Sequence, residues 1–342
     1  MNSLCVRLSE KITEATILKT QGIALENGEK NRLHFGKTIY DLPDAQYPNP
    51  DKPAIVICSG PSLRRKNSIA RIKAALEAGF NADIIAVESS LGHCLRGGLI
   101  PNYMATVDPD YYGYQMVRFL GDTHLTIRPI DDFFVRRDPE NERDEISRNQ
   151  ELIALVNRHG KNIKAIIASS ASPLVTRRCI ESGMELYWWH PMYDDYDEPG
   201  SISKKLSDNT GIPCMETGGK VGTSAWIFAH DILRRKHVAL VGEDVGYAPG
   251  TLPYNTQLYK ELIELLGKNR VNEAFENIYN PYTDETWFVD PTFYWYRQIF
   301  LELAPRAQCT TYNCTEGGTL FGESIEFINL DEFFLKFTKK RG

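Results

Sequence analysis

The sequence predicts an α/β fold in which a Rossmann-like, mostly parallel sheet is flanked by helices, with an N-terminal lead-in and a C-terminal helical extension. Two observations carry this prediction. From residue 52 onward, short apolar segments of strand length alternate with helical patterns, which is typical of a parallel sheet built from strand–helix–strand units. The first apolar segment, Ala54–Cys58, lacks polar alternation, as does a strand that is covered on both faces.

Short apolar segments bounded by turn residues are the expected strands: Ala54–Cys58, Asp83–Val87, Tyr103–Val107, His124–Ile127, Lys164–Ala168, Glu185–Trp189 and His237–Val241. Helical patterns lie between most of them: Ser68–Ala78, Tyr111–Phe119, Glu151–Arg158, Pro173–Glu181 and Thr223–Leu233. In open parallel sheets, ligands bind beyond the carboxyl ends of the strands. The loops that follow the strands are therefore where a functional site is expected.

The alternation divides the chain into three parts. Residues 1–51 form a lead-in, with a possible helix over Glu10–Gln21 and a proline-rich connector before the first strand. Residues 52–250 are the predicted nucleotide-binding core. Residues 251–342 are expected to pack on that core as an extension, with helices near Gln257–Gly267 and Phe293–Leu303 and a strand near Gln308–Tyr312.

Composition excludes several classes of protein. The chain has 342 residues, 42% hydrophobic and 25% charged, as in an ordinary globular protein, and a net charge of −6 argues against a nucleic-acid partner. No apolar segment has the length of a membrane span, and the N-terminus lacks a signal-peptide pattern. Seven cysteines without CxxC pairs indicate reduced thiols. A cytoplasmic location is therefore expected.

Polar residues follow several of the expected strands, where these strands reach the edge of the sheet. The turn Ser59-Gly60-Pro61-Ser62 separates a strand from a helix, and free N–H groups with a positive helix end would favour an anion there. The later strand-end loops contribute Ser89, Asp108, Asp110, Glu243, Asp244 and Tyr247. Each loop alone is explained equally well by an ordinary turn. Four such loops would converge on one crevice.

A glycine-rich segment adds to this candidate site and comprises Gly218, Gly219, Lys220, Gly222 and Thr223. Its glycines would let the backbone approach a ligand, and Lys220 would supply a positive charge for a phosphate. It is not a Walker A loop, because Val221 rather than Ser or Thr follows the lysine. The alternative is a flexible entry to a helix.

Other segments carry weaker signals. Asn313 and Glu316 follow the last expected strand, and Glu316 would bond a ligand hydroxyl or a base edge; a simple turn is the alternative. The acidic segments 131–150 and 194–198 are interpreted as solvated loops rather than metal sites. The histidines are dispersed and no catalytic triad is evident, although His190 and His93 each follow an expected strand.

Five motifs in order resemble the bacterial motility accessory factor family over residues 53–322. They are Ile57-Cys-Ser-Gly-Pro-Ser-Leu63, Leu99-Ile-Pro-Asn-Tyr-Met-Ala-Thr-Val-Asp-Pro109, Gly218-Gly-Lys-Val-Gly-Thr223, Val241-Gly-Glu-Asp-Val-Gly-Tyr247 and Asn313-Cys-Thr-Glu-Gly-Gly318. That family shares its domain with archaeal 6-hydroxymethylpterin pyrophosphokinases and is similar to bacterial CMP-sialic-acid sialyltransferases. The resemblance implies a nucleotide-binding α/β domain.

The sialyltransferase resemblance implies the leading hypothesis, a nucleotide-sugar-dependent glycosyltransferase that transfers a CMP-activated nonulosonic acid to a glycan or protein acceptor without a cofactor. By this resemblance Tyr247 and Tyr254 would stabilise the departing CMP phosphate, and Lys220 takes the place of an arginine. Those enzymes use a C-terminal histidine base, but this chain has no histidine after position 237. The base would then be Asp244 or Asp290.

The pyrophosphokinase resemblance implies an alternative reaction, in which Mg²⁺ and ATP serve to transfer a pyrophosphoryl group to a pterin. Asp108 and Asp110 would bind the metal. The second acidic element of those kinases is only partly matched by His159-Gly-Lys-Asn162, where a lysine replaces a metal-binding acid. A nucleotide-binding protein without catalysis is the third hypothesis.

Overall fold

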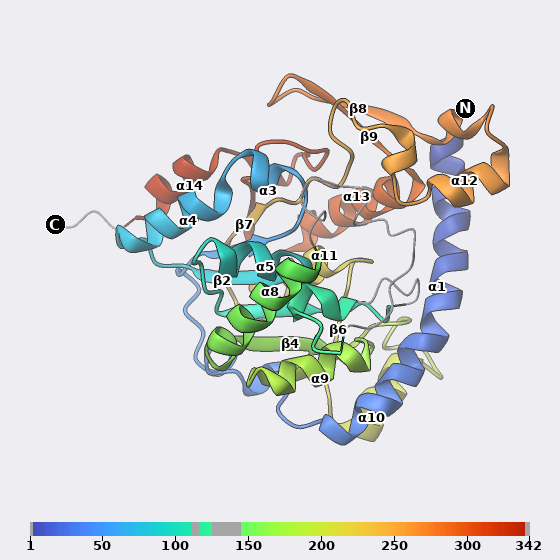
Figure 1. Ribbon diagram of the computed structural model, residues 1–342. Coiled ribbons are helices and arrows are strands. Elements are labelled where there is room, and N and C mark those ends of the chain that lie inside the picture. The colour runs from blue at the N-terminus through green and yellow to red at the C-terminus, as the bar shows by residue number, and fades with distance from the viewer. Residues whose placement is uncertain (1–2, 111–115, 125–144, 339–342) are drawn as a thin grey trace.

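A computed structural model of the chain describes residues 3–110, 116–124 and 145–338 (Figure 1). Within these residues, strands form one nine-stranded sheet in the order β11-β10-β7-β1-β2-β3-β4-β5-β6, and every pair of neighbours in it is parallel. The predicted α/β class is therefore confirmed. The strands are β1 (Ala54–Ile57), β2 (Asp83–Val87), β3 (Tyr103–Thr106), β4 (Lys164–Ala168), β5 (Glu185–Pro191), β6 (Cys214–Met215), β7 (His237–Val241), β10 (Thr310–Asn313) and β11 (Ile325–Phe327).

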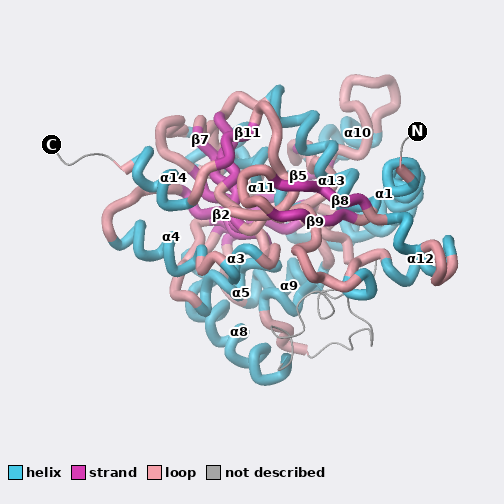
Figure 2. The backbone as a smooth tube through the Cα atoms, turned by 90° about the horizontal axis from the view of Figure 1, so that it is seen from above, coloured by secondary structure: helices cyan, strands magenta, loops and turns pink. Residues whose placement is uncertain are grey.

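Helices cover both faces of this sheet. They include α1 (Leu4–Asn31), α3 (Ser62–Arg65), α4 (Ser68–Glu77), α5 (Glu88–Arg96), α8 (Glu145–His159), α9 (Pro173–Glu181), α10 (Ile202–Thr210), α11 (Val221–Ile227), α12 (Tyr259–Leu266), α13 (Pro291–Leu303) and α14 (Leu330–Phe337). Figure 2 shows α5, α8 and α9 on one side of the strands, and α1 beyond the strand ends, next to α13. None of the helices in the described part of the chain combines the length and apolar character that a membrane span requires.

Alternating strand residues divide the core between the two faces. Val56 of β1 packs with Trp226 of α11 and Phe300 of α13, whereas its neighbours Ile55 and Ile57 pack with α4 and α14 on the opposite face. Because successive side chains of a strand point to opposite faces, a strand covered by helices on both sides must be apolar throughout. This is why β1, β2 and β7 read as continuous apolar segments.

The chain reverses its direction of sheet growth between β1 and β7. Strands β1 to β6 are added one after another towards one edge, and β7, β10 and β11 are added towards the other. In an open parallel sheet, the connections that follow the two strands at such a switch point pack on opposite faces. The carboxyl ends of these two strands therefore border a space suited to a ligand. The loops after β1 and β7 are therefore the first candidates for a site.

Most element predictions are confirmed with shifts of one or two residues at their ends, and several are corrected. The helix expected over Glu151–Arg158 extends over Glu145–His159, so it includes the end of the acidic segment that was expected to be a loop. The lead-in helix expected over Glu10–Gln21 extends over Leu4–Asn31. The helix expected at Thr223–Leu233 is α11 followed by a π-helical turn over Phe228–Ile232. The strand expected at His124–Ile127 and the first half of the Tyr111–Phe119 helix lie outside the described residues.

The C-terminal part holds elements that the sequence did not indicate. The strand expected near Gln308–Tyr312 is β10, which lies beside β7, whereas β11 and the antiparallel hairpin of β8 (Glu276–Asn280) and β9 (Glu285–Val289) were not expected. β6 and α10 were also missed, because a two-residue strand and a short polar helix carry too little periodic signal. The division of the chain at residue 250 stays a prediction.

A buried arginine holds the amino ends of the central strands together. Arg235, just before β7, is fully buried and donates to Asp83 at the start of β2 (Nε–Oδ2 2.6 Å), to Asp44 (Nη2–Oδ1 2.8 Å) and to the carbonyl of Asn49. Since β1 lies between β2 and β7, this arginine spans the strand at the centre of the sheet.

We predict that Arg235→Met lowers the free energy of unfolding by about 3 kcal/mol, the lower end for breaking a buried ion pair, because the buried Asp83 keeps only Lys52 as a counter-charge. Urea denaturation measures this change. The matched control is Lys236→Met, which removes an exposed ion pair with Asp51 and should change stability by less than about 1 kcal/mol. Equal effects of the two substitutions would contradict the assigned role of Arg235.

Candidate functional site

Asp244 joins the two loops that border the switch point. Its carboxylate lies in the loop after β7 and accepts hydrogen bonds from the backbone N–H of Ser62 (3.1 Å) and from the Ser62 hydroxyl. The N–H of Gly60 donates to the carbonyl of Gly242 in the same loop at 2.9 Å. The loops after β1 and β7 are therefore in direct contact, as the sequence predicted for strand ends along one edge.

The approach of these loops requires a glycine at position 60. A Cβ added to Gly60 would lie 2.1 Å from an Asp244 carboxylate oxygen and 2.5 Å from the Gly242 carbonyl oxygen. The contacts also correct one expectation. The N–H groups of Gly60 and Ser62 were expected to be free for an anion, but both already donate within the chain.

The glycine-rich segment packs against the loop after β7 through an ion pair. Lys220, at the N-cap of α11, pairs with Glu243, and only 15% and 7% of their side chains are exposed. Burial lowers the pKa of Lys220 to about 8, opposed by the nearby Asp244. Gly222 allows this arrangement, because a Cβ there would lie within 3 Å of the Glu243 carboxylate and of the Cys58 sulfur.

Residues of this segment and of the β10 loop complete the group around Glu243. The Glu243 N–H donates to the hydroxyl of Thr315 at 3.1 Å, which brings the loop after β10 to the switch point. Gly218 and Gly219 both have positive φ, at 56° and 82°, and pack against Thr223 and Trp295 respectively. The β1, β7 and β10 loops and the start of α11 thus meet at one place.

A second group of polar residues lies at the ends of β2 and β3. The hydroxyls of Ser59 and Ser89 are 2.8 Å apart, which connects the first turn to the start of α5. Glu88 is 1% exposed, and burial together with the nearby Asp108 raises its pKa to about 8. Burial also raises the pKa of Asp108, whose carboxylate accepts from the N–H of Asp110 at 2.7 Å.

The metal assignment for Asp108 and Asp110 stays a prediction. The described residues include no group of three or more His, Cys, Asp or Glu side chains placed to hold a metal ion. Asp110 has a φ of 65°, a conformation that costs a non-glycine residue free energy and that recurs at functional sites. Glu88, at the end of the neighbouring strand, is close enough for Asp108 to raise its pKa.

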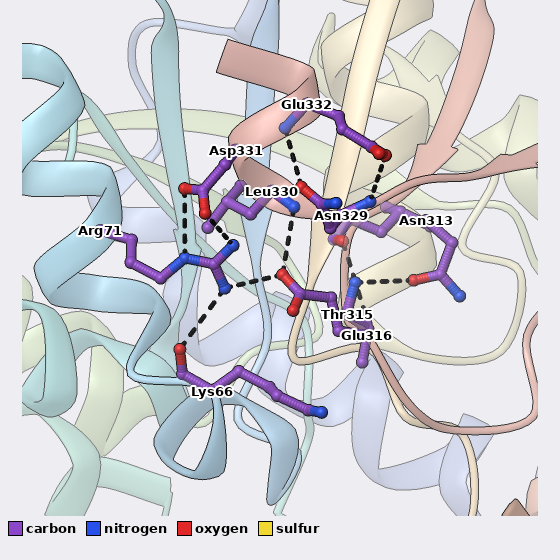
Figure 3. Close-up of polar contacts among 10 residues, drawn as sticks. Lys66, Arg71, Asn313, Thr315, Glu316, Asn329, Leu330, Asp331 and Glu332 are labelled. Carbon is purple, nitrogen blue, oxygen red and sulfur yellow. Dashed lines mark hydrogen bonds and ion pairs between the residues drawn. The ribbon is translucent and has the colours of Figure 1, made fainter. Parts of the chain in front are cut away.

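The C-terminal candidates Asn313 and Glu316 are engaged within the chain. Figure 3 shows Glu316 between Arg71 of α4 and the start of α14: Arg71 donates to it at 2.7 Å and the Leu330 N–H at 3.1 Å. Asn313 is fully buried, accepts from the Thr315 N–H and donates to the Leu320 carbonyl. Both residues therefore shape the loop after β10 rather than present free polar groups at its surface.

The three remaining candidates, Asp290, Tyr247 and Tyr254, lie in different environments. Asp290 is fully buried at the N-cap of α13, where it accepts from the Phe293 N–H at 2.8 Å and from the Tyr247 hydroxyl at 2.7 Å. Tyr247 is 3% exposed and also accepts from the Gln257 N–H. Tyr254, in contrast, is 52% exposed. The Tyr247–Asp290 pair thus ties the loop after β7 to α13.

Sequence reasoning missed residues that lie far from the motifs in the chain. Asn27 of α1 donates to the carbonyls of Pro109 and Ser170, both at 3.0 Å, and so joins the loops after β3 and β4. His190 is buried between the hydroxyls of Ser169 and Thr210, so its role at the edge is structural. A single asparagine in a polar helix offers no sequence signal for such contacts.

Comparison with known proteins yields little similarity. No protein-family model matches the chain, and no curated protein matches it. One matching solved structure is a MAf glycosyltransferase from Magnetospirillum magneticum AMB-1, with 12% identity and a TM-score of 0.48 over 84% of this chain and 37% of that one. The chain thus spans little more than a third of that protein, and a likeness at this level carries no argument about activity.

We predict that Glu88 makes the protein less stable as the pH rises. Its raised pKa means that the folded chain keeps a proton between about pH 5 and 8 that the unfolded chain has released. The free energy of unfolding should fall across this window by at most about 1.4 kcal/mol per pH unit from this group.

Urea denaturation at pH 5, 6.5 and 8 measures this effect in wild type and Glu88→Gln, which is neutral at every pH. The advantage of the variant over wild type should grow from pH 5 to 8. The exposed Glu323→Gln is the control and should follow wild type. A constant difference between Glu88→Gln and wild type at all three pH values would refute the prediction.

Proposed function

We propose that this chain is a glycosyltransferase and that its nucleotide-sugar donor binds beyond the carboxyl ends of β1 and β7. The observation that carries the proposal is the meeting of four polar segments at the topological switch point, where open parallel sheets bind ligands. By the motif resemblance, such a domain would use a nucleotide sugar as its donor. The donor it favours is a CMP-activated nonulosonic acid, and the acceptor is a glycan or a protein.

The Lys220–Glu243 pair is central to how the donor phosphate would be held. A donor phosphate that reaches Lys220 would replace Glu243 as the partner of the lysine ammonium group. In a partly buried setting a charge-assisted hydrogen bond to phosphate is stronger than one in water. The lysine would therefore stabilise the negative charge that develops on the departing CMP phosphate.

The geometry distinguishes between Asp244 and Asp290, the two carboxylates considered as the catalytic base. Asp290 caps α13 and is enclosed by its partners, which leaves it a structural role in this proposal. Asp244 is also buried and bonded to Ser62, but it differs from Asp290 in its place, because it lies at the switch point itself, beside the glycine of the first turn. Asp244 is therefore the base that we propose. Of the two tyrosines, we assign the phosphate to Tyr254, which is 52% exposed, and Tyr247 would act by holding α13 in place.

One observation favours the second candidate, a Mg²⁺-dependent pyrophosphokinase that uses ATP. Glu88 and Asp108 lie close enough at the ends of neighbouring strands for Asp108 to raise the pKa of Glu88. Paired carboxyls of this kind are suited to a hard cation that bridges phosphates. Under this hypothesis Asp108 and Asp110 would hold the metal, and a non-catalytic nucleotide-binding protein is the remaining possibility.

Calorimetric titration of CMP, CDP and ATP, each with and without Mg²⁺, separates these hypotheses. The transferase proposal expects cytidine nucleotides to bind equally well without the metal. Binding of ATP that requires Mg²⁺ would favour the kinase instead. If no nucleotide binds under either condition, the assignment of the site itself is wrong.

We predict that Lys220→Ala weakens CMP binding about 10- to 100-fold, since a hydrogen bond to a charged partner is worth about 1.5–3 kcal/mol. Because this substitution leaves Glu243 buried without its partner, the double variant Lys220→Met/Glu243→Gln is measured beside it. Lys236→Ala, at the amino end of β7, is the control. An unchanged CMP affinity in the folded double variant would remove Lys220 from the site.

A further inference from the structure

A tryptophan on α13 lies directly against the glycine-rich segment. A Cβ added to Gly219 would be 2.3 Å from Cζ3 and 2.5 Å from Cη2 of Trp295, so the ring is packed against the glycine backbone. Trp295 is part of the aromatic run Phe293-Tyr-Trp-Tyr296 in the first turns of α13. Gly219 is itself exposed at the protein surface.

Trp295 differs from the other tryptophans of the chain in its exposure. The chain has five tryptophans, and four of them are at most 2% exposed: Trp188, Trp189, Trp226 and Trp287. Trp295 is partly exposed. The four buried rings fill the core, whereas Trp295 is the tryptophan that keeps contact with solvent.

The position of α13 is fixed on the side that faces the switch point. Asp290 caps the helix and bonds Tyr247 from the loop after β7, and the Tyr247 ring packs on Phe293 with centroids 4.9 Å apart. The helix is thus tied to the same loop that supplies Glu243 to Lys220. Trp295 thus packs on Gly219, and the next residue in the chain is Lys220, whose ammonium pairs with Glu243.

We infer that Trp295 is a stacking platform for the nucleobase of the ligand, with Lys220 holding the phosphate of the same molecule. The inference rests on the proposed function, and it adds a base subsite to it. A mononucleotide carries its base and its phosphate on either side of one ribose, which matches an aromatic ring next to a cation. Stacking tolerates any base because every base presents a π-face, so Trp295 contributes affinity rather than selectivity among bases.

The test compares two ligands that share a phosphate but differ in the base. CMP and ribose 5-phosphate are titrated against wild type, Trp295→Phe and Trp295→Ala without Mg²⁺. We expect Trp295→Ala to weaken CMP binding about 5- to 150-fold, the range found when a stacking aromatic is replaced by alanine. Ribose 5-phosphate should be affected less than about twofold, and Trp295→Phe should retain most of the CMP affinity.

Fluorescence offers a second readout, because Trp295 is the partly exposed tryptophan. Acrylamide should quench one component of wild-type emission, CMP should protect it, and Trp295→Phe should lack it. Tyr279→Ala, which alters an exposed aromatic residue of β8, is the matched control and should behave as wild type. Protection by free sialic acid but not by CMP would assign the ring to the sugar and overturn the inference.

The outcomes separate this inference from the proposed function. If wild type binds CMP but Trp295→Ala binds it equally well, the base subsite is wrong and the proposed site survives. If Trp295→Ala weakens CMP and ribose 5-phosphate equally, the ring only supports the glycine backbone, and the inference again fails. If wild type binds no nucleotide at all, the proposed function fails and takes the inference with it.

Discussion

The carboxylate of Asp244 is the contact on which the carboxyl edge of this sheet depends. Beyond the last pair of β1 and β7, Ile57 and Val241, backbone hydrogen bonds from Cys58 to Val241 and from Gly60 to Gly242 join the two strand ends. The Asp244 carboxylate adds the side-chain contact between the loops. A buried carboxylate is costly unless its oxygens are hydrogen-bonded, and Ser62 meets that need from the other loop. Positions 60 and 318 therefore require glycine, because a side chain at either position would collide with Asp244.

This constraint explains why polar residues that look suited to a ligand are already paired. Ser62 donates a hydrogen bond to Asp244. Lys220 forms an ion pair with Glu243, and Arg71 forms one with Glu316. Buried polar groups need hydrogen-bond partners in the folded chain. Without a ligand, the polar groups at this edge of the sheet therefore bond to one another. A ligand that enters here exchanges one set of partners for another. Its net binding free energy is then set by how well it replaces the Lys220–Glu243 pair.

The sheet could be predicted from the sequence because burial on both faces leaves long apolar segments, as in β1, β2 and β7. The convergence of strand-end loops followed from parallel topology alone. The roles of Tyr247 and Asp290 could not be predicted, since their bond joins residues 43 positions apart and neither lies in a periodic pattern. The same holds for Asn27, whose two carbonyl partners come from loops that only the fold brings side by side.

Burial also sets the charge of the candidate site. It lowers the pKa of Lys220 and raises that of Glu88, each to about 8, because an ionised group loses hydration when it is enclosed. At neutral pH, Lys220 therefore keeps its proton, and Glu88 also holds one and carries no negative charge beside Asp108. The raised pKa of Glu88 makes the edge less negative than its count of carboxyls suggests, whereas the lowered pKa of Lys220 acts in the opposite direction. In a chain whose net charge is −6, a phosphate bound at the switch point, as we propose, would depend on this local balance rather than on the overall charge.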